Sequence, residues 1–181
     1  MVLHEKGIDF GVHGIDLKNK SEEFLRISPT GKVPVVVVDG DPLYESNVVN
    51  QFLDEVAQEP RLLPEDPKER AHARIWMASA DDDFYPVVFV ASMGREIGFS
   101  EERVSEALEK LKTVLSDLEE WLDGRDYLAG VEFSLADIAY AGNLVSLREL
   151  EGRREVSLED FPNLRAWMGR LEGRGSYEAA A

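Results

Sequence analysis

Residues 31–46 constrain the fold more than any other part of this 181-residue chain. Four consecutive valines, residues 35–38, run directly into Asp39-Gly40. A short β-branched run bounded by turn residues predicts a strand buried on both faces, and Asp-Gly predicts a tight hairpin turn. Ser46 is placed to cap a helix, because apolar residues recur on one side of residues 48–56. The sequence therefore predicts a strand, a turn, a short return strand and a helix in immediate succession.

Charge and composition exclude several classes of function. Aspartate and glutamate total 36 against 20 lysines and arginines, a net charge of −16, which argues against nucleic acid or an anionic membrane as a partner. The chain has no cysteine, so disulfides, thiolate zinc sites and Cys-x-x-Cys redox pairs are excluded. His4, His13 and His72 are scattered, and no metal-ligand spacing or Ser-His-Asp order stands out. No segment resembles a membrane span or a signal peptide, so we expect a cytoplasmic protein.

The first thirty residues predict short elements. Residues 1–6 look like the end of a helix that stops at Gly7. Residues 8–15 alternate apolar and polar side chains, which predicts a half-buried strand. Residues 21–27 predict a short helix with Phe24 and Leu25 directed inward.

Helix signals dominate the chain from residue 66 onward. Asp66 is expected to cap a helix with Pro67 in its first turn, and Pro86 should kink or end that helix about one turn earlier. Ser100 precedes residues 104–122, the clearest amphipathic pattern in the chain, which Gly124 ends.

A second capping signal precedes the most apolar segment. Ser134 and Asp137 are spaced as a capping box, so replacing Asp137 by alanine should cost about 1 kcal/mol as a lost cap. Residues 135–147 are apolar nearly all round, which predicts one buried central helix. A last helix should begin at residues 161–164, and residues 176–181 should be frayed.

Three runs together resemble the signatures of the cytosolic glutathione S-transferases, the bacterial type included. They are Ser28-Pro29-Thr30-Gly31-Lys32-Val33-Pro34, then Leu43-Tyr44-Glu45-Ser46, and finally Tyr127-Leu128-Ala129-Gly130 with Phe133-Ser134-Leu135-Ala136-Asp137. The resemblance implies an α/β thioredoxin-like N-terminal region, incomplete because its first strand is missing, followed by an all-helical C-terminal domain. Residues 1–58 would form the first region, 59–65 the linker and 66–181 the helical domain. Members of the family are mostly homodimers, which we also expect here.

The resemblance also implies a glutathione site. Lys32 would lie near the glutathione backbone or its glycine carboxylate, and the main chain of Val33 would pair with the cysteinyl part, an arrangement that depends on Pro34. Ser46 would hold the γ-glutamyl carboxylate at a helix N-terminus, and Glu45 would meet the adjacent ammonium. From the residues alone, Lys32 also suits a solvated loop and Ser46 a plain cap.

An aromatic stripe has two interpretations. Phe84, Tyr85 and Phe89 are spaced to pack in a helical core, which is the simpler interpretation. In the resembling family this helix lines the pocket for an apolar second substrate, so the same residues are candidates for that pocket.

The front of the chain departs from the family pattern. In the family, a first strand and the loop with the catalytic Tyr, Ser or Cys precede a helix that ends like Glu5-Lys6-Gly7-Ile8. Neither has a counterpart here, so we expect a shortened N-terminus with the thiol-activating residue upstream of Met1. Residues 8–15 would then lack their pairing strand.

Two functions follow from the resemblance. The first is a glutathione S-transferase that takes glutathione as substrate and conjugates its thiol to a small apolar electrophile. The second is a non-catalytic binding protein on the same scaffold, because residues 2–10 and Tyr44-Glu45-Ser46 also look similar to the stringent starvation proteins, which bind RNA polymerase.

Overall fold

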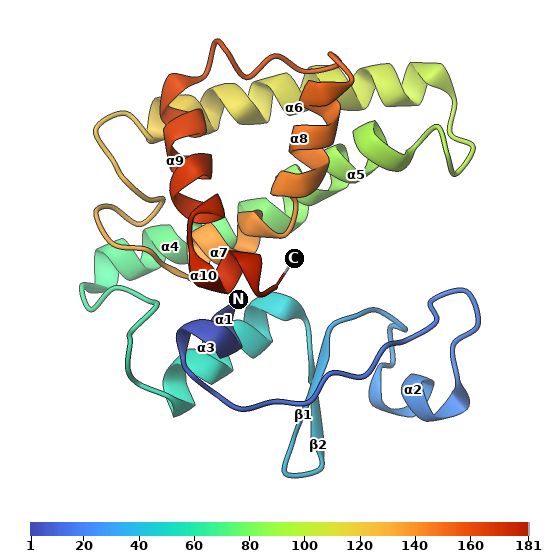
Figure 1. Cartoon of the computed structure of the whole chain (residues 1–181), viewed down its shortest axis with the longest axis vertical. Helices are drawn as coiled ribbons and strands as arrows, with labels where there is room; N and C mark the ends of the chain where they lie inside the picture. The colour runs from blue at the N-terminus through green and yellow to red at the C-terminus, as the bar shows by residue number, and fades with distance from the viewer. Residues whose placement is uncertain (181) are drawn as a thin grey trace. The chain divides into compact units, whose positions relative to one another are not determined.

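The computed structural model describes residues 1–180 (Figure 1). The chain divides into two units, the first of which is Met1–Arg61 and the second of which begins at Leu62. The first unit contains a β-hairpin with short helices, and the second is all-helical among its described residues. This arrangement confirms the predicted fold class, an α/β N-terminal region followed by a helical domain. None of the described helices combines the length and the apolar character needed to cross a membrane.

The first unit is built around the hairpin. Its elements are α1 (Val2–Glu5), α2 (Glu22–Ile27), β1 (Val35–Val38), β2 (Asp41–Tyr44) and α3 (Ser46–Val56). The strands are antiparallel, with Val38 opposite Asp41 and Val35 opposite Tyr44. The two-residue turn between them has φ values of 52° at Asp39 and 88° at Gly40, so the predicted Asp-Gly turn is confirmed.

Strand β1 is less buried than the sequence predicts. The side chain of Val37 is 52% exposed, and the other three valines are only half-buried. The prediction of a strand buried on both faces is therefore wrong. The described part of the chain forms a sheet of only two strands, which is too small to be covered on both sides.

Residues 8–15 form no strand, so that prediction is also wrong. Val12 is 80% exposed, and β1 and β2 are the only strands among residues 1–180. Alternation cannot produce a strand without a neighbour to pair with its amide and carbonyl groups. In α2, Phe24 is buried as predicted but Leu25 is 46% exposed, because this short helix presents only one position to the interior.

Lys6 holds the first unit together, and sequence reasoning missed it. Helix α1 ends as predicted at Gly7 (φ 61°), and the Ile8 amide donates to the Leu3 carbonyl at 3.0 Å. The Lys6 side chain turns inward and is fully buried. Its ammonium donates to Asp54 at 2.5 Å, to the Ala57 carbonyl at 2.7 Å and to the Pro60 carbonyl. A cation thus meets the C-terminal end of α3, where the helix dipole favours positive charge.

The second unit is an assembly of helices around α7. Its elements are α4 (Pro67–Ser79), the π-helical turn η1 (Ala80–Phe84), α5 (Tyr85–Met93), α6 (Glu101–Trp121), α7 (Leu135–Ala141), α8 (Leu144–Gly152), α9 (Pro162–Glu172) and α10 (Gly175–Glu178). Helix α5 packs along α6 and α8, while α7 contacts α4, η1 and α9 (Figure 1). The predicted amphipathic helix is α6, whose apolar stripe is buried.

Pro86 changes the helix as predicted. The chain passes from α4 into one π-helical turn before it resumes as α5, with Pro86 in the first turn of α5. A proline inside a helix removes one backbone donor and clashes with the preceding turn, and a wider turn relieves both problems.

Two helix predictions fail near the end of the chain. The single helix expected over residues 135–147 is divided at Gly142 and Asn143 into α7 and α8. The tail expected to be frayed forms α10, in which Ser176 is buried, whereas Ala181 lies outside the described residues. The tail is ordered because α10 packs against α9, a contact that local sequence could not indicate.

Asp137 does more than cap a helix. The predicted capping box with Ser134 is present, and the carboxylate has no exposed surface. It accepts bonds from the Leu128 amide (2.9 Å), the Ser134 amide (2.8 Å), the Ser134 hydroxyl (2.9 Å) and the Trp167 indole (2.8 Å). Burial raises the pKa of Asp137 above its usual range, and these donors oppose that shift. Because several buried donors would lose their acceptor, the structure predicts that removal of Asp137 costs more than the roughly 1 kcal/mol expected of a cap alone.

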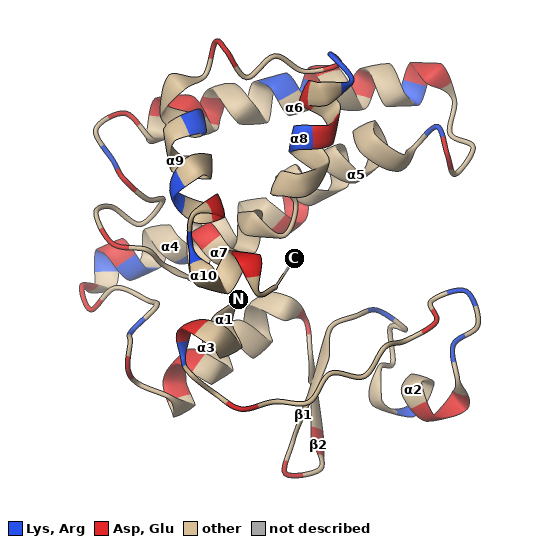
Figure 2. Cartoon of the chain, in the orientation of Figure 1, with Lys and Arg blue, Asp and Glu red and all other residues tan. Residues whose placement is uncertain are grey.

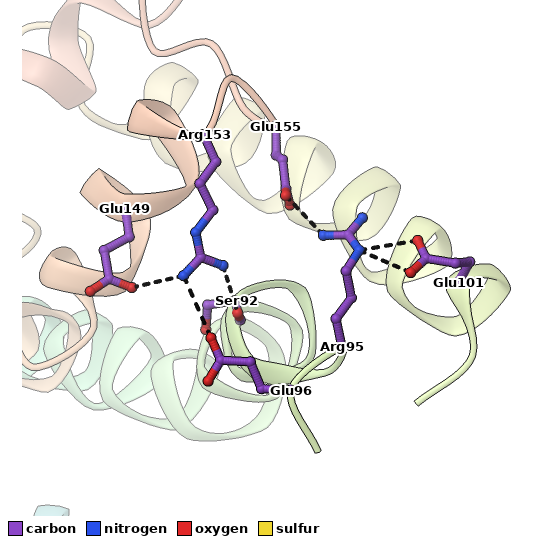
Figure 3. A network of polar contacts seen from close by, with 7 residues as sticks. All are labelled: Ser92, Arg95, Glu96, Glu101, Glu149, Arg153 and Glu155. Carbon is purple, nitrogen blue, oxygen red and sulfur yellow. Dashed lines mark hydrogen bonds and ion pairs between the residues drawn. The ribbon is translucent and has the colours of Figure 1, made fainter. Parts of the chain in front are cut away.

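Arginines join the ends of three helices at the surface of the second unit (Figure 3). Arg95 pairs with Glu101 at 3.1 Å and with Glu155 at 2.8 Å, and Arg153 donates to the Ser92 carbonyl at 3.0 Å. Elsewhere, lysines and arginines lie scattered among more numerous acidic residues rather than gathered over one element (Figure 2). Exposed pairs of this kind are screened by salt and stabilise only weakly.

Candidate site at the open end of the hairpin

The hairpin register brings two of the sequence runs together. Val35 lies opposite Tyr44, so the residues just before Val35 and just after Tyr44 meet at the end of the hairpin away from the turn. Pro34 and Glu45 are the next residues along the two strands. The register therefore places Val33-Pro34 and the start of α3 at one end of the hairpin.

The loop that precedes β1 presents its residues outward. Lys32, Val33 and Pro34 are exposed, and the Val33-Pro34 peptide bond is cis. The loop is fixed from inside, since the buried Ser28 hydroxyl donates to the Lys32 carbonyl at 2.8 Å. The Gly31 amide also donates to the Ser28 carbonyl at 2.9 Å. A fixed and exposed main chain can pair with an extended peptide.

The sequence predicted that Ser46 caps α3, but Ser46 is the first residue of this helix. The cap position belongs to Glu45, whose side chain makes no capping bond and whose backbone has φ 65° and ψ 107°. The first bond of the helix runs from the Val49 amide to the Glu45 carbonyl at 2.9 Å. A non-glycine residue with positive φ is strained, and such strain is concentrated at functional sites. Because Glu45 supplies no capping oxygen, the start of this 11-residue helix suits an acceptor from outside the chain.

Lys20 is a further residue at this loop that sequence reasoning missed. A Cβ atom added to Gly31, which has φ 65°, would lie 3.3 Å from the Lys20 ammonium. Lys20 therefore reaches across to the residue that precedes Lys32. No local pattern could have indicated this contact, because it depends on how residues 20–31 fold back around α2.

The three aromatic candidates for a second-substrate pocket face different ways. Phe84 is only 1% exposed, and its ring packs against Tyr140 with centroids 4.8 Å apart. Tyr85 and Phe89 are 49% and 38% exposed, and their rings form a pair 5.9 Å apart. The structure thus puts Phe84 in the helical core and the other two on an exposed face of α5.

Metal ligation has no support in the described part of the chain. No group of three histidine, aspartate or glutamate side chains converges among residues 1–180. The histidines lie apart, with His4 against Phe10 and His72 against Trp121. The candidate site therefore consists of main-chain groups, a helix start, two lysines and a glutamate.

Comparisons with known proteins show which family the chain belongs to. Residues 1–56 match the N-terminal domain family of glutathione S-transferases, and residues 82–174 match the C-terminal domain family. "Glutathione transferase GST 23" of Zea mays is 35% identical over 178 residues, covering 93% of this chain and 76% of that protein. "Glutathione S-transferase U7" of Arabidopsis thaliana is 32% identical over 177 residues, covering 96% and 76%.

Solved structures of glutathione S-transferases and related enzymes also resemble this chain. The β-etherase LigF of Sphingobium sp. strain SYK-6 superimposes with a TM-score of 0.87 at 28% identity, covering 98% of this chain and 90% of that one. A sphingomonad glutathione S-transferase complexed with glutathione gives a TM-score of 0.85 at 28% identity, covering 99% and 89%. Both units match, and the sequence and structural relatives agree. The chain belongs to the glutathione S-transferase family.

Proposed function

We propose that this chain binds glutathione at the open end of the hairpin and conjugates the glutathione thiol to a small apolar electrophile. The observation that carries the proposal is the register of β1 and β2, which puts an exposed main-chain segment beside a helix start that lacks a side-chain cap. Together these groups suit a peptide that carries a free carboxylate at each end.

Each proposed contact uses one chemical property of the site. The γ-glutamyl carboxylate accepts hydrogen bonds from the amides at the start of α3 and from the Ser46 hydroxyl. Glu45 pairs with the ammonium group of the same glutamyl residue. The main chain of Val33, directed by Pro34, pairs with the cysteinyl residue. Lys32 and Lys20 attract the glycine carboxylate, because Lys32 follows Gly31 in the chain and the Lys20 ammonium lies close to Gly31.

The electrophile would bind against apolar surface of the helical unit. Tyr85 and Phe89 form an exposed aromatic pair there, and Phe84 supports α5 from the core side. Aromatic faces of this kind favour flat apolar molecules. The transfer itself needs the glutathione thiol as thiolate, and we assign that activation to none of the residues named here.

Glutathione binding can be measured directly by titration calorimetry with the reduced tripeptide. We expect Ser46→Ala to weaken binding about tenfold, because one charge-assisted hydrogen bond contributes roughly 1.5 kcal/mol or more. Ser100→Ala is the matched control, since Ser100 caps α6 in the other unit. Equal affinity of Ser46→Ala and wild type would overturn the assignment.

Variants of Lys32, Lys20 and Glu45 test the remaining contacts in the same titration. Lys32→Met and Lys20→Met should weaken glutathione but not its analogue that lacks the glycine residue. Glu45→Gln should weaken glutathione but not its des-amino analogue. Losses that are equal for glutathione and the matching analogue would contradict these assignments.

A non-catalytic protein that binds RNA polymerase, as stringent starvation proteins do, is the second candidate. The names of the relatives do not favour it over a transferase. We also propose a homodimer in the cytoplasm, as is usual for the family and where reduced glutathione is abundant. Sedimentation of the purified chain tests the dimer.

A further inference from the structure

The tryptophans of the helical unit are joined through Tyr140 in one chain of rings. The ring centroids of Trp121 and Trp76 lie 5.4 Å apart, those of Trp76 and Tyr140 6.2 Å, and those of Tyr140 and Trp167 6.0 Å. Trp121 and Trp76 are half-buried, whereas Tyr140 and Trp167 have no exposed surface. The rings therefore form a continuous route from the surface into the core. Indole and phenol are the side chains most easily oxidised by one electron in a protein without cysteine.

The two ends of this route differ in charge. At the outer end, the Arg125 guanidinium lies 4.2 Å from the centroid of the Trp121 ring, and a cation there opposes removal of an electron. At the inner end, the Trp167 indole N–H donates to the Asp137 carboxylate at 2.8 Å. A carboxylate favours the oxidised ring and can accept its proton, and burial raises the pKa of Asp137, which makes it a stronger base.

Tyr140 lies between the tryptophans but has no partner that could take its proton. Its hydroxyl is buried and forms no hydrogen bond among the described residues. Ser79 lies near enough to favour the ionised phenol, yet no hydrogen bond of sound geometry joins the two, and burial raises the pKa of Tyr140 far above its usual range. A tyrosyl radical persists only after losing its proton. Tyr140 therefore connects Trp76 with Trp167 but is not the end of the route.

From these observations we infer a second chemical property of the protein, namely that one-electron oxidation at Trp121 is passed inward and comes to rest on Trp167. A one-electron oxidant, such as an organic radical or a photogenerated metal complex, takes an electron from the Trp121 indole. Trp76 then gives an electron to the oxidised Trp121, and Trp167 gives an electron to the oxidised Trp76 through the Tyr140 ring. The oxidised Trp167 gives its indole proton to Asp137. The products are the reduced oxidant, a neutral indolyl radical at Trp167 and a protonated Asp137.

Flash photolysis of the full chain with ruthenium(III) tris-bipyridine tests this inference. The acidic surface attracts this cation, and transient absorption distinguishes a neutral indolyl radical from the radical cation. In the wild type we expect the neutral radical, and mass spectrometry of the oxidised protein should locate the product mainly at Trp167. A radical cation that persists, or product confined to Trp121, would overturn the inference.

Variants identify the route. Trp76→Phe replaces a half-buried ring by one that is hard to oxidise, so the product should stay at Trp121 and be lost from Trp167. Tyr85→Phe, an exposed ring outside the route, is the control and should leave the pattern unchanged. Undiminished oxidation of Trp167 in Trp76→Phe would show that the ring chain is not the path. Trp121→Phe should lower the Trp167 product as well, and an unchanged yield there would contradict entry at Trp121.

Discussion

The two units of this chain are stabilised very differently. Among the described residues, Val2, Phe24, Val49 and Leu53 are the buried apolar side chains of the first unit, and several of its larger apolar residues are more than 40% exposed. The second unit buries a continuous apolar core from Leu62 to Leu171. The second unit therefore contributes most of the stability. The exposed main chain and the strained residue of the candidate site lie in the first unit. Sites that must accept a ligand are commonly found in the less stable part of a protein.

Asp137→Ala should have the largest effect and should act on the second unit. The change leaves buried donors from Leu128, Ser134 and Trp167 without an acceptor, which we expect to cost about 4 kcal/mol in the free energy of unfolding. Urea unfolding followed by tryptophan fluorescence measures it, because all three tryptophans lie in this unit. A loss near 1 kcal/mol would mean that Asp137 is only a helix cap.

Lys6→Met should act on the first unit instead. It removes the ammonium that joins α1 to the end of α3 and leaves Asp54 without that cation, at an expected cost of about 3 kcal/mol. Hydrogen exchange should increase in residues 1–61 and remain unchanged in α6 and α7. Lys18→Met, an exposed lysine in the same unit, is the control. Faster exchange throughout both units would contradict the idea that they are stabilised separately.

Much of this contrast could be predicted from local sequence signals. The Asp39-Gly40 turn, the stop at Gly7 and the apolar stripe of α6 depend on neighbours along the chain, and the structure confirms them. The irregular path of residues 8–15 and the inward turn of Lys6 depend on partners far away in sequence. The register that forms the candidate site was predictable from the hairpin, but the positions of Lys20 and of the strained Glu45 were not.

Glu119→Ala should have a smaller effect, confined to one helix of the second unit. Helix α9 has no side-chain cap of its own, and the Glu119 carboxylate of α6 accepts the amides of Asn163 at 3.1 Å and Leu164 at 2.8 Å. Removing this cap should cost about 1 kcal/mol. Glu120→Ala, which changes the exposed neighbour, should stay within about 0.5 kcal/mol of wild type in the same denaturation assay. Equal losses would mean that Glu119 does not serve as the cap.

The smallest expected effect is a pH dependence, because the donors around Asp137 oppose the effect of burial. Burial raises the pKa of Asp137 above its ordinary value of 3.8, so the folded chain holds the proton more tightly than the unfolded chain. The resulting stability is fully present below 3.8 and is lost as the pH rises through the folded pKa. The advantage of wild type over Asp137→Asn in unfolding free energy should therefore shrink with rising pH. An advantage that grows with pH would mean that the donors outweigh burial.

Pro42 gives the hairpin a consequence beyond its register. It lies in β2 opposite Val37, and because proline has no amide hydrogen, its residue must occupy a pair that exchanges no hydrogen bonds, with its nitrogen on the outer side of β2. That flank of the hairpin lacks one of the donors that a neighbouring strand would need, whereas β1 keeps all of its own. Pro42 therefore disfavours the pairing of another strand with β2, which protects the hairpin from edge-to-edge association.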